Sequence, residues 1–276
     1  MDDVELGRIP AQRELPEPVK FARPIMLLPE LFTTPRHLAL VLGYLASTGW
    51  EVFVPNLRAA FGKGATPPLE KLRFVDLAAL AAEALDAIGR DAVVLGHGVG
   101  GLVALKLSEH RRVKAAVAYA PLVPGFPTPL LSGLTNRLAT MFGRPIKPPR
   151  GRTLFELIAD SDPFARDGLI NAMLPDSSAL AADVIAGEVH FAAPDKAAPR
   201  LIVAGESDIF APFARTSEFA ESIGAKLAKI AGRGHWLIGG RALERAINET
   251  QRFLVRALGQ DLLLLYPEEW KNEPRD

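Results

Sequence analysis

The amino-acid sequence predicts an α/β protein built on one mostly parallel, doubly wound sheet, with a helical cap inserted near its middle. Three observations lead to this fold class. Short apolar runs of strand type alternate with longer segments of helical periodicity. The chain has 276 residues, of which 49% are hydrophobic, so it can bury one large core. The alternation stops between residues 122 and 197 and then resumes, which indicates an insertion between two strands.

The first part of the chain alternates between strand and helix. PIMLLP (24–29) is a short apolar run ended by proline and predicts a buried strand. Residues 36–48 carry leucines at helical spacing, and GWEVFVPNL (49–57) returns to strand character. Residues 68–88 again place apolar side chains near helical spacing, before the strand DAVVLG (91–96). Strands separated by helices in this way form parallel neighbours with helices on both faces of the sheet.

A helix at 99–109 and a strand at 113–121 follow, and then the proline-rich segment 122–197 interrupts the pattern. We expect this segment to be a cap over the strand ends, with short helices near 153–160 and 177–186. A disordered linker is less consistent with it, because the segment keeps apolar residues that need burial. These are Leu154, Phe155, Leu157, Ile158, Leu169, Ile170 and Leu174.

The last part of the chain resumes the alternation. Strand, helix, strand and helix are expected at 200–208, 212–223, 225–232 and 241–258. The core domain would therefore comprise residues 1–121 and 198–276, with the cap insertion at 122–197. The tail from residue 262 begins apolar and ends polar, and we expect it to dock and then fray.

The composition excludes several classes of function. Lysine and arginine number 32 and so do aspartate and glutamate, so no basic field attracts nucleic acid or an anionic membrane. The absence of cysteine excludes thiol nucleophiles and thiolate metal sites. No apolar run has signal-peptide character or spans a membrane, so a cytoplasmic location is expected. The expected partner is a small-molecule substrate or ligand, and a homodimer is left open.

VVLGHGVGGLVAL (93–105) reads as a buried strand, a tight turn and a helix, with Gly98 at the tip. Such a turn strains its central residue and needs small neighbours two positions away, here Gly96 and Gly100. Glycine-rich turns also bind phosphates, and Gly96, Gly98 and Gly101 fit dinucleotide spacing. However, the next strand ends in AYAP without a carboxylate, and the turn follows at least two earlier strands, which speaks against dinucleotide binding.

Two further residues follow strands at the same expected edge of the sheet. Asp208 lies in AGESDIFAP and His235 lies in GRGHWL, each just past a predicted strand. A carboxylate placed there can hold an imidazole in one tautomer and stabilise its charged form. Taken singly, Asp208 could belong to a polar turn and His235 could be an ordinary loop residue. Together with the turn at Gly98, and in this order along the chain, they indicate one site.

With these motifs in place, the chain resembles the α/β-hydrolase fold superfamily across residues 20–260. The resemblance implies a nucleophile at Gly98, an acid at Asp208 and a histidine at His235, although the superfamily has Ser, Asp or Cys at the first position. It also implies that the backbone N–H groups of Leu31 and Val99 form an oxyanion hole.

The loop after the first predicted strand departs from the pattern as well. LLPELF (27–32) has Pro29 and Glu30 where the superfamily typically has His-Gly. Within the glycine-rich motif, His97 is commonly a packing and hydrogen-bonding residue, and we expect no catalytic role for it.

Glycine has no nucleophilic atom, so a covalent intermediate at Gly98 is excluded, and three hypotheses remain. In the first, Asp208 and His235 act as a noncovalent general base on a small apolar carbonyl compound such as an ester or lactone, by hydrolysis, elimination, isomerisation or cyclisation. Glu30 would be a second acid or base with a pKa raised by an apolar pocket, or else a surface carboxylate on a loop.

The second hypothesis is a catalytically inactive pseudo-hydrolase that binds a ligand or serves as a scaffold. The third is a serine esterase carrying an engineered Ser-to-Gly change at position 98. None of the three requires a cofactor. His37, His110 and His190 lack companions at metal-ligand spacing, so no metal site is expected either.

Overall fold

The computed structural model describes residues 1–61, 68–132 and 134–262, and its centre is an eight-stranded sheet in the order β1-β2-β4-β3-β5-β6-β7-β8. All neighbours from β4 to β8 pair in parallel, whereas β1–β2 and β2–β4 pair antiparallel. The predicted mostly parallel α/β sheet is therefore confirmed. The strands are β1 Asp2–Leu6, β2 Ile9–Glu14, β3 Ile25–Leu28, β4 Val52–Pro55, β5 Ala92–His97, β6 Val113–Tyr119, β7 Arg200–Gly205 and β8 Lys226–Ile230.

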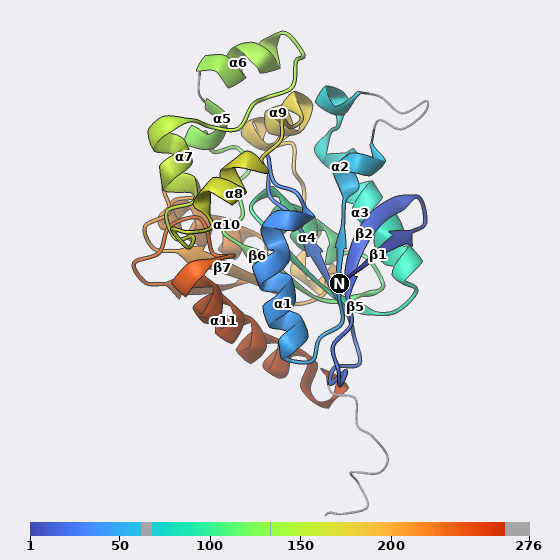
Figure 1. The fold of residues 1–276 in the computed structure, drawn as a ribbon. Helices are drawn as coiled ribbons and strands as arrows, with labels where there is room; N and C mark the ends of the chain where they lie inside the picture. The colour runs from blue at the N-terminus through green and yellow to red at the C-terminus, as the bar shows by residue number, and fades with distance from the viewer. Residues whose placement is uncertain (62–67, 133, 263–276) are drawn as a thin grey trace, which may run out of the picture.

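Helices lie on both sides of this sheet, with α11 along one side and α3 along the other (Figure 1). The helices are α1 Ala39–Ser47, α2 Leu57–Ala60, α3 Phe74–Ile88, α4 Val99–Leu107, α5 Pro129–Ser132, α6 Leu134–Met141, α7 Gly151–Leu157, α8 Arg166–Asn171, α9 Ser178–Ala186, α10 Phe213–Ser222 and α11 Gly240–Leu258. Short 3-10 turns are η1 Pro35–Leu38, η2 Leu69–Lys71, η3 Pro194–Lys196 and η4 Gly259–Leu262. Within the described residues, no helix is long and apolar enough to cross a membrane.

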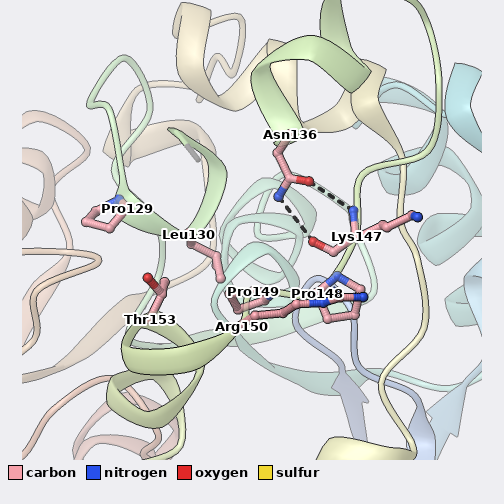
Figure 2. Close-up of a pocket in the computed structure, with 8 residues that line it drawn as sticks. All are labelled: Pro129, Leu130, Asn136, Lys147, Pro148, Pro149, Arg150 and Thr153. Carbon is pink, nitrogen blue, oxygen red and sulfur yellow. Dashed lines mark hydrogen bonds between the residues drawn. The ribbon is translucent and has the colours of Figure 1, made fainter. Parts of the chain in front are cut away.

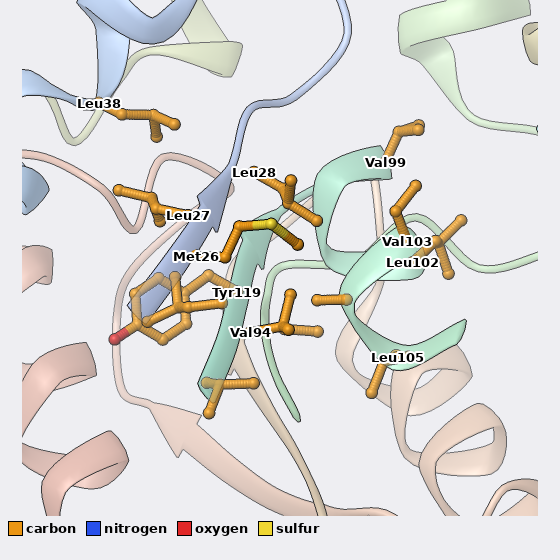
Figure 3. Close-up of a cluster of buried hydrophobic side chains, with 14 of the residues drawn as sticks. Met26, Leu27, Leu28, Leu38, Val94, Val99, Leu102, Val103, Leu105 and Tyr119 are labelled. Atoms are coloured by element: carbon orange, nitrogen blue, oxygen red, sulfur yellow. The ribbon is translucent and has the colours of Figure 1, made fainter. Parts of the chain in front are cut away.

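The central strands are buried on both faces, as parallel strands between two helical layers must be. Every residue of β3 and β5 is buried. Leu27 and Leu28 point to opposite sides of β3, Leu27 on the side of Leu38 and Leu28 on the side of Val99 and α4 (Figure 3). This two-sided packing explains why these strands read as continuous apolar runs.

Two predicted helices begin with a separate turn. The segment expected at 68–88 starts as η2 and continues as α3 only from Phe74. The Asp76 carboxylate accepts a hydrogen bond of 2.9 Å from the backbone N–H of Arg73 and so caps the helix there. Likewise, the helix expected at 36–48 is η1 followed by α1, with Pro35 at the first position.

The N-terminal hairpin of β1 and β2 was not predicted. Its sequence reads as charged and broken by proline, because the hairpin lies at the edge of the sheet and buries few side chains. Leu6, Ile9 and Ala11 face the core, while most of the other residues are exposed or half-buried. Gly7 makes the turn with a φ of 64°.

Residues 122–197, the predicted cap, carry α5 to α9 and gather at one end of the molecule (Figure 1). Their hydrogen bonds reach loops that follow parallel strands. The N–H of Leu174 donates to the carbonyl of Phe32 after β3, and Asp160 accepts from the N–H of Gly234 after β8. The segment therefore contacts the carboxyl edge of the sheet. The expected docked tail lies mostly at 263–276, outside the described residues.

Candidate active site

The turn between β5 and α4 has the geometry of a tight strand-to-helix elbow. Gly98 sits at its tip with a φ of 53°, in the left-handed region that favours glycine. A Cβ at Gly96 would overlap the carbonyl of Gly100, and a Cβ at Gly100 would overlap the carbonyl of Leu28. The small residues of the motif are therefore required by the close approach of α4 to β3 and β5.

The carboxyl group of Glu30 fills the space above Gly98. A Cβ built on Gly98 would fall inside that carboxyl group, closest to Oε2. Glu30 has no exposed surface. The expectation of a surface carboxylate at this loop is therefore wrong, because the loop directs the side chain inward between β3 and α4.

The loop after β3 orients Glu30 through hydrogen bonds made by the backbone of Glu30 and of the residues that follow it. The N–H and the hydroxyl of Thr33 both donate to the Glu30 carbonyl, at 3.2 and 2.9 Å, and close a tight turn. Phe32 has a φ of 63°, a conformation that non-glycine residues rarely adopt. Its N–H donates to Asp176 of the predicted cap at 2.9 Å, which holds the strained residue in place.

The two N–H groups that the resemblance assigns to an oxyanion hole converge on one atom. Leu31 donates to Oε1 of Glu30 at 2.6 Å, and Val99 donates to the same oxygen at 2.9 Å. Val99 is the first residue of α4, so the positive end of the helix dipole also faces this oxygen. The geometry is that of an anion-binding site, and the anion in it is the protein's own carboxylate.

Asp208 and His235 meet at the same edge. The loop after β7 carries Asp208, whose Oδ1 accepts from the N–H groups of Phe210 and Ala211 at 2.7 and 3.0 Å. Its Oδ2 lies 2.8 Å from Nδ1 of His235, which follows β8. On the other side of the ring, Nε2 lies 3.2 Å from Oε2 of Glu30. The imidazole is thus held between two buried carboxylates.

This arrangement favours a charged imidazole. Burial by itself lowers the pKa of His235, but the charge and hydrogen bond of Asp208, together with those of Glu30, raise it to about 10. Burial raises the pKa of Glu30, yet His235, His97 and the N–H of Val99 outweigh it and leave that pKa below its ordinary value. The expectation of a raised Glu30 pKa is therefore wrong, since a cation faces the carboxylate.

His97 lies against the same group, although the sequence indicated only a packing role. It is fully buried, and its Nε2 lies 2.9 Å from the backbone carbonyl oxygen of His235. Among the residues that the structure describes, its Nδ1 has no hydrogen-bond partner, and it lies 3.9 Å from Oε2 of Glu30. Burial, followed by the charge of His235, lowers the pKa of His97 to about 4, so the ring is neutral.

Strand order, elbow, acid and histidine together define an α/β-hydrolase type of architecture. The chain matches the family model described as "Alpha/beta hydrolase family" over residues 29–247 and belongs to that family. No curated protein sequence matches the chain.

Solved structures show the same fold. The chain is similar to a monoacylglycerol lipase of Paleococcus ferrophilus, with a TM-score of 0.66 and 19% identity over 88% of this chain and 98% of that one. A thermophilic esterase from Thermogutta terrifontis gives a TM-score of 0.65 and 17% identity over 90% and 94%. A putative aryl esterase from Burkholderia cenocepacia gives 0.67 and 19% over 91% and 96%. At these identities the likeness concerns the fold.

Proposed function

We propose that this α/β-hydrolase family member is a pseudo-hydrolase that binds a small apolar ligand and does not cleave esters. The observation that carries the proposal is the position of the Glu30 carboxylate. Ester cleavage in this architecture needs two N–H donors for the oxygen that becomes negative in the transition state. Here Leu31 and Val99 already donate to Oε1 of Glu30, so a substrate carbonyl has no donors left.

The missing nucleophile supports the same conclusion. Gly98 offers no atom for an acyl-enzyme, and a serine Cβ there would collide with Glu30. This overlap weighs against the hypothesis of a single engineered Ser-to-Gly change, because restoring serine alone would not restore a fitting side chain. His235 is also engaged on both ring nitrogens and has its pKa raised to about 10, so near pH 7 it has no lone pair to accept a proton.

Two cavities in the predicted cap support the proposal of ligand binding. One cavity of about 590 Å³ is lined mainly by apolar groups, among them Leu138 and Phe142, with Arg144 and Lys147 beside them. A second cavity of about 320 Å³ shares Asn136 and Lys147 with the first (Figure 2).

The Asn136 side chain holds the wall that the two cavities share. It donates to the Lys147 carbonyl at 3.1 Å and accepts from the Lys147 N–H at 3.0 Å. Apolar walls beside cationic side chains suit a small apolar molecule with a carbonyl or carboxylate group.

A second candidate is the noncovalent acid–base enzyme acting on a small apolar carbonyl compound. The observation in its favour is the intact Asp208–His235 hydrogen bond of 2.8 Å, which a pure binding protein does not need. This mechanism requires Glu30 to leave the two N–H groups. Without Glu30, His235 would lose one of its anionic partners and its pKa would fall toward the range in which imidazole accepts a proton.

Hydrolysis of p-nitrophenyl butyrate separates the two candidates. The pseudo-hydrolase proposal expects wild type and His235→Ala to give the same rate. A wild-type rate well above that of His235→Ala would overturn the proposal in favour of the acid–base enzyme.

Ligand binding is tested separately with 8-anilinonaphthalene-1-sulfonate, an apolar anion. Lys147→Gln should weaken its binding several-fold. Lys114→Gln is the control, because Lys114 lies on β6 and pairs with Asp91 away from the cavities. Equal probe binding by wild type and Lys147→Gln would contradict the cavity assignment.

A further inference from the structure

We propose that Glu30, His97 and His235 form a binding site for a divalent first-row metal ion, with zinc the best match. Each residue offers one ligand atom, these atoms all lie within 4.8 Å of one another, and all three residues are buried. The proposal goes beyond the ligand-binding function, which does not involve a metal. It depends on which ring nitrogen of each histidine lies nearest the Glu30 carboxylate.

The hydrogen bond of His97 leaves one nitrogen free for a metal. A backbone carbonyl can only accept, so the carbonyl of His235 requires the proton of His97 to be on Nε2. Nδ1 therefore carries a lone pair, and this buried nitrogen has no hydrogen-bond partner among the described residues. A buried polar atom left unpaired costs free energy, and it calls for a specific explanation. A metal ion would provide that partner.

In His235, too, a hydrogen bond to one ring nitrogen leaves the other to act as the metal ligand. Asp208 accepts a hydrogen bond from Nδ1, which leaves Nε2 as the ligand atom facing Glu30. A carboxylate behind a metal-binding histidine fixes the tautomer and strengthens the ligand. On binding, the metal ion takes the place of the proton on Nε2, and that proton passes to solvent. Both imidazoles thus have an oriented outer partner.

Distances and charge fit a small divalent cation. Tetrahedral zinc, with bonds of 2.0–2.1 Å, separates its ligand atoms by about 3.3 Å. The Oε2 atom of Glu30 lies 3.2 Å from Nε2 of His235 and 3.9 Å from Nδ1 of His97. A dipositive ion would neutralise the carboxylates of Glu30 and Asp208, whereas a single proton leaves one negative charge. Two imidazoles with one carboxylate favour zinc over calcium or magnesium.

The experiment is a titration of the full chain, stripped with EDTA, with Zn²⁺ by calorimetry and with Co²⁺ by visible absorption. Wild type should bind one ion per chain, and Co²⁺ should develop the intense visible bands of a tetrahedral site. His97→Ala should weaken binding at least tenfold. His190→Ala is the matched control, because His190 is exposed and should leave the affinity unchanged.

Two results would overturn the proposal: wild type that binds no stoichiometric Zn²⁺ at micromolar concentrations, or His97→Ala that binds as tightly as wild type. If His97→Ala does not fold, as judged by circular dichroism, Glu30→Gln replaces it, since this variant keeps the shape and removes the charge. It too should lose at least tenfold in affinity, and unchanged binding would overturn the site. These readouts are independent of ester hydrolysis, so they stand apart from the pseudo-hydrolase proposal.

Discussion

Glu30 and Gly98 are sterically complementary: the carboxyl group of Glu30 occupies the volume that the Cβ of any other residue at position 98 would need. The same carboxyl group accepts from both N–H groups that the resemblance assigns to an oxyanion hole, and it faces His235. One side chain thus takes up the nucleophile position and the oxyanion position together.

Restoring a serine should generate esterase activity only when Glu30 is removed as well. We expect the double variant Glu30→Gly, Gly98→Ser to hydrolyse p-nitrophenyl butyrate at least about 10³-fold faster than wild type, because nucleophile, histidine and free N–H donors would then coincide. Gly98→Ser alone should show no such gain. Initial rates at matched protein concentration decide the matter, and a single variant as active as the double would contradict the assignment.

Gly98→Ala should destabilise the fold by about 2–5 kcal/mol, since the added methyl meets the Glu30 carboxyl group and the backbone has a positive φ. The free energy of unfolding in urea measures this. Gly43→Ala serves as the control, because a Cβ there meets nothing within 4 Å in the exposed face of α1, and alanine should be neutral or stabilising. Comparable losses from both variants would refute the steric argument.

Glu30→Gln should lower the pKa of His235 below its value of about 10, because the ring loses one of its two anionic partners and retains Asp208. We expect a decrease of about one unit or more. Nitrogen-15 chemical shifts of the His235 ring, followed by NMR across pH 6 to 11, report this directly. An unchanged titration would mean that Glu30 does not interact with the ring in solution.

Stability of the metal-free protein should depend on pH in a defined direction. The folded-state pKa of His235 is raised from 6.5 to about 10, so its contribution is complete below pH 6.5 and is lost as the pH rises toward 10. The free energy of unfolding should fall there by up to about 1.4 kcal/mol per pH unit.

The contribution of Glu30 to stability has the opposite pH dependence. Because its folded-state pKa is lowered from 4.5, its contribution is present above that pH and is lost as the pH falls through the lowered value. Urea unfolding of wild type and His235→Ala, measured across the alkaline and the acid pH range, checks both predicted changes in the free energy of unfolding. The alkaline decline should be much shallower in the variant, and parallel curves would show that His235 is not responsible.

Much of the fold followed from local patterns in the chain. Continuous apolar runs marked β3, β5 and β7, and the glycines around Gly98 marked the elbow, because burial and backbone strain impose residue types locally. The hairpin of β1 and β2 escaped prediction, since an edge hairpin buries too few side chains to produce a clear pattern. The order of Asp208 and His235 after successive strands placed both at one sheet edge.

Sequence alone therefore predicted the family, the tight turn at Gly98 and the placement of Asp208 and His235 at one sheet edge, and it marked Glu30 as a departure from the family pattern. Only the tertiary structure decided where the Glu30 carboxylate goes and which nitrogen of His97 has no hydrogen-bond partner among the described residues. Glu30 and His235 are 205 positions apart in the chain yet 3.2 Å apart in space. The periodicity of a sequence reports whether a segment is buried. Which side chain fills a given space depends on how loops that are far apart in the sequence converge, and tertiary packing decides how they converge.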